Sequence, residues 1–232
     1  EHLPEPQRIV ASLRSILHAN PGANVYLEVP RFAWIAEQAT FFDLFYEHCS
    51  LFSETSMRRM LDDCGLRIHS LQATFDGQYL AVLARLRARS VPLDHFEGMP
   101  DAYLTDLFDQ LHRERQRWVT EINTLCADYT VLLWGAGAKG VSVLNHLGLR
   151  DNIIPAIVDI NPAKQGRFVP VTGQRVIGPH ELHGFADVHK PLSIVAMNPN
   201  YQPEIRRTLR ELHVDSLLTT MSEAETVASH HR

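Results

Sequence analysis

Short apolar runs alternate with amphipathic segments through the second half of the chain. The runs lie at 131–133, 153–158, 192–197 and 216–218, and helical patterns lie at 141–147 and 203–212. Strands that alternate with helices in this way form a parallel sheet covered by helices on both faces. The pattern therefore predicts an α/β fold class, with a parallel-sheet domain over residues 128–232.

The first half of the chain mixes helical and strand patterns. After Pro6, an amphipathic helix is expected to carry Ile9, Leu13, Ile16 and Leu17 on one face. Further along, the predicted elements are a strand at 25–29, a helix capped by Ser53 with Met57, Met60 and Leu61 inward, and strands at 66–71 and 78–83. Asp76-Gly77 between the last two strands is a strong hairpin signal.

A break in the pattern separates the two halves. Residues 90–101 hold Pro92, Gly98 and Pro100, which are typical of a linker. A long helix is predicted over 102–127, with an apolar stripe made of Leu104, Leu107, Phe108, Leu111, Trp118, Ile122 and Leu125. That stripe is either a packing face within the protein or a seam between two copies. The expected division is 1–98, a linker helix at 99–127, and 128–232.

Composition narrows the function classes. The 232 residues are 45% hydrophobic and carry a formal net charge of −5, and their basic residues are dispersed, so no nucleic-acid partner is expected. Three cysteines without CxxC spacing favour a reduced, cytoplasmic protein. No apolar run reaches about 18 residues, so no membrane partner is expected either. The histidines show no metal-ligand spacing, which predicts no metal site. Glu1 in place of methionine suggests a fragment.

A glycine-rich turn follows the first strand of the parallel-sheet pattern. Gly135, Gly137 and Gly140 let the backbone turn, approach a bound group and pack a helix on a strand. Lys139 would add positive charge there, and Asp159 follows the next strand, near the place of a ribose-binding acid. Residues 131–159 therefore predict a Rossmann-like βαβ unit. It either binds a dinucleotide such as NAD or is structural, without any nucleotide.

Two further groups are candidates for binding or chemistry. Asn198, Asn200 and Tyr201 follow the strand at 192–197, where they could bind a substrate or satisfy their own turn. Glu28, at the end of an apolar strand, is either a site carboxylate or a solvated acid.

Tyr46-Glu47-His48 is the sharpest catalytic candidate. An imidazole can remove a proton near neutral pH, and a carboxylate can orient it or share the task. Consecutive residues on a regular strand point to opposite faces, so the three serve one site only on an irregular turn. The alternative is a half-buried histidine beside a surface acid.

Several ordered motifs resemble the S-adenosylmethionine-dependent C-methyltransferases that act on nucleotide-linked deoxysugars. The matching segments are Glu1-His2 with Pro6, Glu28-Val29-Pro30, the block at 46–53, the glycine loop at 135–140, Asp159 to Gly166 and Asn198 to Tyr201. The resemblance implies that residues 1–98 are the C-terminal half of a class I methyltransferase-type catalytic domain. The domain after it would be the family's C-terminal Rossmann-like domain.

The resemblance also implies roles. Glu47 and His48, with Tyr46 beside them, would be the general base that makes an enolate, and S-adenosyl-L-methionine would donate the methyl group. The glycine loop (Gly135, Gly137, Lys139, Gly140), Asp159, Asn198, Asn200 and Tyr201 would hold the substrate, a nucleotide sugar. The family's zinc-binding cysteines and its cofactor loop are not in this chain, so a missing N-terminal half is a possible partner. Alone, the chain is expected to transfer little or no methyl.

Two alternatives come from other functional classes. The first is an NAD(P)-type oxidoreductase or a non-catalytic nucleotide-binding module centred on 128–232. The second is a degenerate protein that presents a substrate to another enzyme. Family members also often carry Gly-Gly where this chain has Asp76-Gly77-Gln78, a hairpin that could border the pocket.

Overall fold

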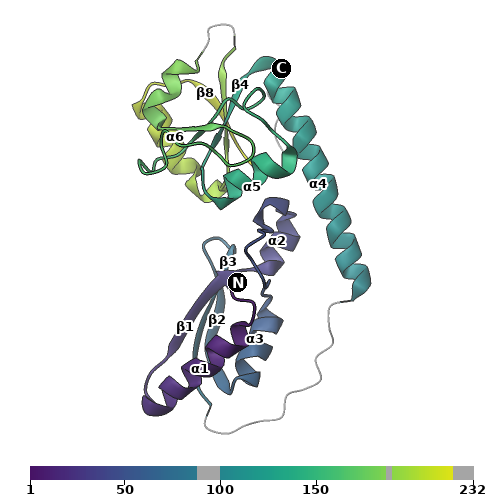
Figure 1. Ribbon diagram of the computed structural model, residues 1–232, viewed down its shortest axis with the longest axis vertical. Coiled ribbons are helices and arrows are strands. Elements are labelled where there is room, and N and C mark those ends of the chain that lie inside the picture. The colour runs from purple at the N-terminus through teal and green to yellow at the C-terminus, as the bar shows by residue number, and fades with distance from the viewer. Residues whose placement is uncertain (88–99, 187–189, 222–232) are drawn as a thin grey trace. The chain divides into compact units, whose positions relative to one another are not determined.

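The computed structural model describes residues 1–87, 100–186 and 190–221, and the chain forms two compact units (Figure 1). The N-terminal unit comprises residues 1–39 and 44–109, and the C-terminal unit comprises residues 40–43 and 110–232. The predicted boundary between 98 and 99, and most of the predicted linker, lie outside the described residues. The three-part division therefore stays a prediction.

The N-terminal unit is built on a three-stranded antiparallel sheet with the order β1-β3-β2. The strands are β1 (Val25–Pro30), β2 (Leu66–Thr74) and β3 (Tyr79–Leu86), and the helices are α1 (Pro6–Ala19), α2 (Phe32–Gln38) and α3 (Glu54–Asp63). The predicted hairpin joins β2 to β3. Its turn residues Phe75, Asp76 and Gly77 have positive φ angles of 51°, 53° and 84°, which is the backbone conformation that Asp-Gly favours.

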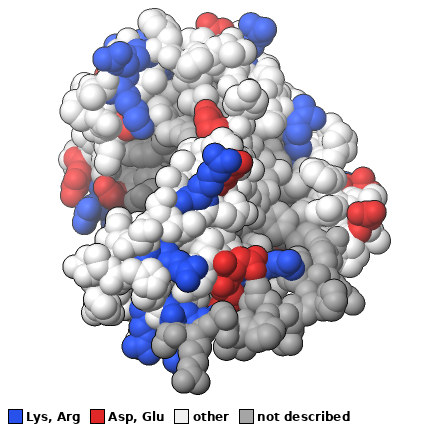
Figure 2. All heavy atoms as spheres, turned by 60° about the horizontal axis from the view of Figure 1, so that its bottom comes forward, with Lys and Arg blue, Asp and Glu red and all other residues white. Residues whose placement is uncertain are grey.

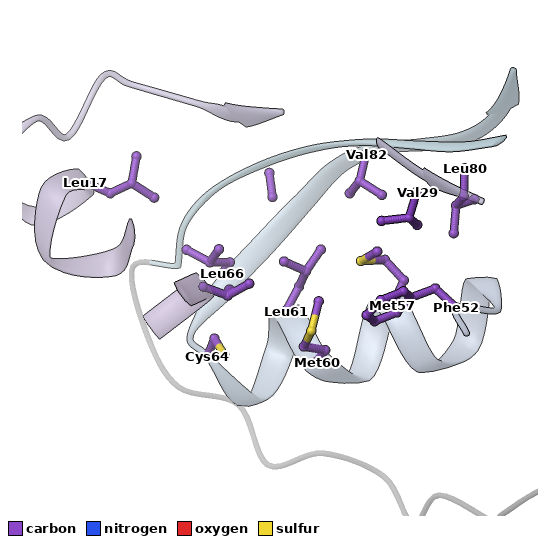
Figure 3. Packing of buried hydrophobic residues seen from close by; sticks show 12 residues of the cluster. Leu17, Val29, Phe52, Met57, Met60, Leu61, Cys64, Leu66, Leu80 and Val82 are labelled. Carbon is purple, nitrogen blue, oxygen red and sulfur yellow. The ribbon is translucent and has the colours of Figure 1, made fainter. Parts of the chain in front are cut away.

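The core of this unit lies between α3 and the sheet. Figure 3 shows Met57, Met60 and Leu61 of α3 pointing toward the strand side chains Leu80 and Val82. Leu61 and Leu80 are completely buried. The predicted helix and its inward residues are therefore confirmed.

The predicted apolar face of α1 is only partly correct. The buried residues are Val10 and Leu17, whereas Ile9 and Ile16 are 50% and 58% exposed. Each exposed isoleucine precedes a buried residue by one position, which is about 100° around a helix with 3.6 residues per turn. Only a narrow strip of the α1 surface is buried against the rest of the unit. The periodicity of a wide apolar stripe does not show which of its edges is buried.

Ser53 caps α3 as predicted, and removing the cap is expected to destabilise the N-terminal unit. The Ser53 hydroxyl accepts a hydrogen bond from the Ser56 amide at 3.1 Å, and the Ser56 hydroxyl accepts one from the Ser53 amide at 2.9 Å. Ser53→Ala should lower the free energy of unfolding by about 1 kcal/mol in chemical denaturation. Thr55→Ala, at an exposed site on the same helix, is the matched control. Equal losses in both variants would contradict a capping role.

The C-terminal unit contains a five-stranded parallel sheet with the order β6-β5-β4-β7-β8. Its strands are β4 (Thr130–Trp134), β5 (Ala156–Val158), β6 (Arg175–Ile177), β7 (Leu192–Ala196) and β8 (Ser216–Thr220). Its helical elements are α5 (Ala138–Leu147), α6 (Gln202–Glu211) and the 3-10 turns η1 (Phe41–Asp43), η2 (Pro179–Gly184) and η3 (Pro199–Tyr201). The strand order reverses between β4 and β7, where open α/β sheets bind ligands. The α/β fold class with a Rossmann-like sheet is confirmed.

The long helix α4 (Asp101–Asp128) begins in the N-terminal unit and ends in the C-terminal unit. Of its predicted stripe, Leu107, Leu111, Trp118, Ile122 and Leu125 are buried within the single chain, which is what a packing face requires. Phe108 departs from the prediction, because its side chain is 62% exposed.

Charged side chains of both signs lie on the face shown in Figure 2. Neither sign covers that face alone. Arg85, Arg87 and Arg89 lie close together in the sequence. Arg89 is outside the described residues, and Arg87 pairs with Asp62. Within the described ranges, no helix is both long and apolar enough to cross a membrane.

Candidate functional site

His48 lies in a short loop that the first residues of the chain hold in place. Its amide donates to the Phe45 carbonyl at 3.1 Å, and the amides of Cys49 and Ser50 donate to the Glu1 carbonyl at 2.8 and 3.2 Å. The imidazole meets the Phe45 ring edge-on, with 4.9 Å between ring centroids, and meets the His2 ring edge-on at 4.7 Å. These contacts fix the orientation of the His48 ring.

The environment of His48 keeps its imidazole neutral. Burial lowers the pKa of His48, the nearby Glu1 carboxylate opposes that effect, and a cationic His2 reinforces it, so that the pKa lies below its ordinary value of 6.5. The His48 Nδ1 atom is buried and has no hydrogen-bond partner among the described residues. A neutral, half-buried imidazole of this kind can accept a proton from a substrate near pH 7.

The three consecutive candidates do not converge. Tyr46 is fully exposed, at 101%, and the Glu47 side chain is exposed as well. The groups that do surround His48 are Glu1 and His2, and the ligand atoms of these three side chains lie within 4.8 Å of one another. Sequence reasoning missed His2, because residues 2 and 48 are brought together only by folding. It also found no metal-ligand spacing, whereas this trio has the donor atoms that a metal would use.

The low pKa of His48 has a measurable consequence. The imidazole is expected to take up its proton at a pH below about 6.5, since burial opposes the charged form. Proton NMR of the ring hydrogens across a pH series measures the midpoint, and His48→Gln assigns the signal by removing it. A midpoint at or above 6.5 would mean that the acidic partner Glu1 outweighs burial, contrary to this expectation.

The glycine loop lies between β4 and α5, at the carboxyl end of the parallel sheet. Gly135 has a φ of +116°, which an L-residue rarely adopts. A Cβ on Gly140 would lie 2.1 Å from the Gly135 carbonyl oxygen and 2.9 Å from Ile157 Cδ1. Gly137 differs, because its φ is −89° and a Cβ there would meet nothing within 4 Å. Two glycines therefore serve the turn and the helix packing, and the third leaves open space beside the backbone.

Asp159 holds this loop together. Its carboxylate accepts hydrogen bonds from the Ala136 amide at 2.9 Å, the Asn161 amide at 2.8 Å and Lys164 Nζ at 3.0 Å. Gln165 Nε2 donates to the Asp159 carbonyl at 2.9 Å. Hydrogen bonds thus connect the stretch from Asp159 to Gly166 with the glycine loop. Both oxygens of the Asp159 carboxylate already accept hydrogen bonds, although the hydroxyl groups of a nucleotide ribose would need the same oxygens as acceptors.

Lys139 is engaged within the same unit. Its ammonium lies 3.1 Å from each carboxylate oxygen of Asp43, a residue that is 5% exposed. The positive charge of Lys139, which the sequence predicts beside a phosphate, is therefore paired with the buried carboxylate of Asp43.

Polar groups of the loop after β7 form hydrogen bonds within the loop itself. The Asn198 side-chain oxygen accepts a hydrogen bond from the Asn200 amide at 3.0 Å and so starts η3. Tyr201 is 49% exposed at the end of that turn. Glu28, on the N-terminal unit, is exposed and accepts a hydrogen bond from Tyr26 at 2.5 Å, which fits the solvated acid.

The described residues of the C-terminal unit do not fit S-adenosyl-L-methionine. A strand-to-helix loop that binds such a nucleoside offers a carboxylate to the ribose hydroxyls. Here the corresponding carboxylate, Asp159, is turned onto the loop amide and Lys164. The same geometry argues against NAD at this loop.

The C-terminal unit is thus a Rossmann-like domain, and comparison with known proteins identifies its family. The family described as "C-methyltransferase C-terminal domain" matches residues 98–216. C-methyltransferase NovU from Streptomyces niveus is 25% identical over 217 residues, which cover 88% of this chain and 50% of NovU. A solved structure, a Rex-family repressor called RSP, is 13% identical and covers 93% of this chain and 85% of its own, but its TM-score of 0.31 is too low to establish a shared fold.

The chain belongs to the C-methyltransferase family, of which it carries the C-terminal domain. It spans about half the length of the curated relative that it matches.

Proposed function

We propose that this chain is the proton-abstracting and substrate-binding portion of an S-adenosylmethionine-dependent C-methyltransferase acting on a carbon of a nucleotide-linked sugar. Family membership supports methyltransferase chemistry. The observation that carries the assignment of the base is the half-buried His48, whose pKa is lowered by burial and whose Nδ1 has no partner within the described structure.

The proposed step is removal of one proton. The neutral His48 imidazole takes it from a carbon next to a ketone, or from the hydroxyl of the enol form, and leaves an enolate as the carbon nucleophile. Of the acids near His48, Glu1 raises its pKa more than Glu47 does, so Glu1 would stabilise the imidazolium that forms. Glu47 and Tyr46 stay proposed members of the base. Their role is secondary to that of His48, because both side chains are exposed to solvent.

Substrate binding by the C-terminal unit is proposed for the loops after β4, β5 and β7. Gly137 would let a ligand approach the backbone, and Asn200 and Tyr201 would offer hydrogen-bonding groups at the neighbouring loop. Gly135, Gly140, Asp159 and Asn198 would act by shaping those loops, as their contacts indicate.

The methyl donor would be held elsewhere. S-adenosyl-L-methionine supplies an electrophilic methyl group when bound, and we propose that the half of such an enzyme not represented by this chain binds it. Three free cysteines support a reducing, cytoplasmic location for the protein.

Ligand binding tests the proposal against its alternative. The purified chain is heated with nucleoside diphosphates, nucleotide-linked keto sugars, NAD(H) or S-adenosylmethionine, because a ligand that binds only the folded state raises its melting temperature. Stabilisation by nucleotide sugars, without stabilisation by S-adenosylmethionine, is expected. Stabilisation by NAD(H) alone would contradict the proposal and favour the oxidoreductase alternative, which no other observation supports.

A further inference from the structure

A carboxylate and two imidazoles meet beside the loop that carries His48. Glu1, His2 and His48 each offer one ligand atom, and these atoms all lie within 4.8 Å of one another. His2 Nε2 lies 3.8 Å from Glu1 Oε1, and the rings of His2 and His48 lie 4.7 Å apart between centroids. All three residues belong to the N-terminal unit, so the cluster forms within one unit.

Backbone hydrogen bonds hold the two segments of this cluster together. The amides of Cys49 and Ser50 donate to the Glu1 carbonyl at 2.8 and 3.2 Å. The Cys49 thiol also donates to the His2 carbonyl at 3.7 Å. The fold itself therefore brings the first two residues of the chain beside the loop.

His48 contributes an atom that lacks a hydrogen-bond partner. Its Nδ1 is buried, and no group among the described residues bonds to it. Native proteins leave few buried polar atoms in this state, and a bound ion or water is a common reason for one. The Phe45 ring packs edge-on against the imidazole at 4.9 Å between centroids, which restricts its rotation. This atom is a second observation, besides the clustering of donors, that points to a ligand.

The donor set suits zinc. Two imidazoles and one carboxylate bind Zn²⁺ in catalytic sites of known proteins, with a further position left for water or a substrate. Ligand atoms bound to one zinc ion lie about 3.4 Å apart. The largest separation here, 4.8 Å at most, exceeds that spacing by about 1.4 Å. The side chains of the exposed His2 and the half-buried Glu1 can close this gap by rotating toward His48.

We propose that Glu1, His2 and His48 form a zinc-binding site, and that zinc bound there prevents His48 from accepting a proton. A neutral imidazole has one nitrogen lone pair available, because its other nitrogen carries a hydrogen. Zinc bound to that lone pair leaves the ring with no acceptor for the substrate proton. The zinc site stands on the three side chains alone, and only its inhibitory effect rests on the proposed function.

Metal binding is measured first, without any substrate. Competition with a chromogenic chelator gives the Zn²⁺ affinity, and Co²⁺ in its place gives a visible absorption spectrum that reports coordination by protein ligands. The variants Glu1→Gln, His2→Gln and His48→Gln each remove one ligand. His18→Gln is the matched control, because His18 is an exposed histidine on α1 of the same unit. Cys49→Ser removes a free, exposed thiol next to the cluster that is not one of the three ligands.

The wild-type chain is expected to bind one Zn²⁺ at this site. Each ligand variant should weaken binding by about 10–100-fold or more, because even an outer-shell partner of a metal contributes that much. His18→Gln and Cys49→Ser should bind zinc as the wild-type chain does. A wild-type chain that binds no zinc would overturn the site, as would His48→Gln with unchanged affinity. An equal loss in His18→Gln would also overturn it, since binding would then belong to surface histidines in general.

Deuterium uptake at the carbon next to the ketone of a nucleotide-linked sugar then tests the effect of the ion. The rate of uptake by the wild-type chain should fall in proportion to zinc occupancy, and a chelator should restore it. Uptake at the full rate with the site filled would overturn the inhibitory effect. A chain that takes up no deuterium even without zinc would overturn the proposed function instead, while the zinc affinities still decide whether the site exists.

Discussion

Replacing His48 by glutamine is expected to slow proton removal from the substrate carbon by about 10²–10⁴-fold. Glutamine fills a similar space but has no nitrogen that takes up a proton near neutral pH. The neutral state of the wild-type imidazole follows from burial, which lowers the pKa of His48. The rate of the wild-type chain should therefore fall only when the pH drops below the ordinary histidine range.

Deuterium uptake from heavy water, followed by proton NMR of a nucleotide-linked keto sugar, measures this step. His18→Gln is the matched control, since His18 is exposed on α1, in the same unit. Tyr46→Phe tests the neighbouring phenol, whose complete exposure predicts a much smaller loss than that of His48→Gln. If His48→Gln exchanged deuterium as fast as the wild-type chain, another base would have to be sought.

The parallel-sheet domain was predictable because its signals are local. The apolar run before Gly135, the glycine spacing and the acid after the next strand all lie within one βαβ unit. Each of these signals acts on the backbone within a few residues, and the structure contains β4, α5 and β5 in that order. The Asp-Gly hairpin and the Ser53 cap were predictable for the same reason.

The partners of the candidate side chains were not predictable, because they are set by contacts between distant residues. Asp159 is predicted beside a ribose, and its carboxylate also accepts hydrogen bonds from the Ala136 amide and Lys164. Lys139 is predicted beside a phosphate, and its ammonium also pairs with Asp43, 96 residues earlier in the chain. A charged residue in a motif therefore predicts where a charge lies, whereas folding decides what neutralises it.

His2 shows the same limit from the other side. By spacing it was one scattered histidine among several, yet backbone hydrogen bonds from the 49–50 segment to Glu1 bring its ring to 4.7 Å from that of His48. The one sequence signal for this proximity was the family resemblance, because Glu1-His2 and the block at 46–53 both match motifs of the same family. A resemblance can thus find residues that share a site when periodicity and spacing cannot.

Gly140→Ala is expected to destabilise the C-terminal unit by about 3 kcal/mol, the upper end of the usual cost of overpacking. The added Cβ would lie 2.1 Å from the Gly135 carbonyl oxygen and 2.9 Å from Ile157 Cδ1. The carbonyl belongs to the tight turn, so it cannot rotate away as a flexible side chain would. The better helix propensity of alanine, about 1 kcal/mol, offsets only part of this cost.

Gly137→Ala is the matched control, in the same loop and with the same added methyl group. Its φ of −89° suits alanine, and the new Cβ would meet nothing within 4 Å, so the loss of stability should stay below about 1 kcal/mol. Denaturant titration of both variants measures the difference, and equal stabilities would contradict the packing role of Gly140. Because Gly137 is proposed to lie beside the ligand, its variant should remain folded and yet bind nucleotide sugars more weakly, which separates a glycine needed for folding from one needed for binding.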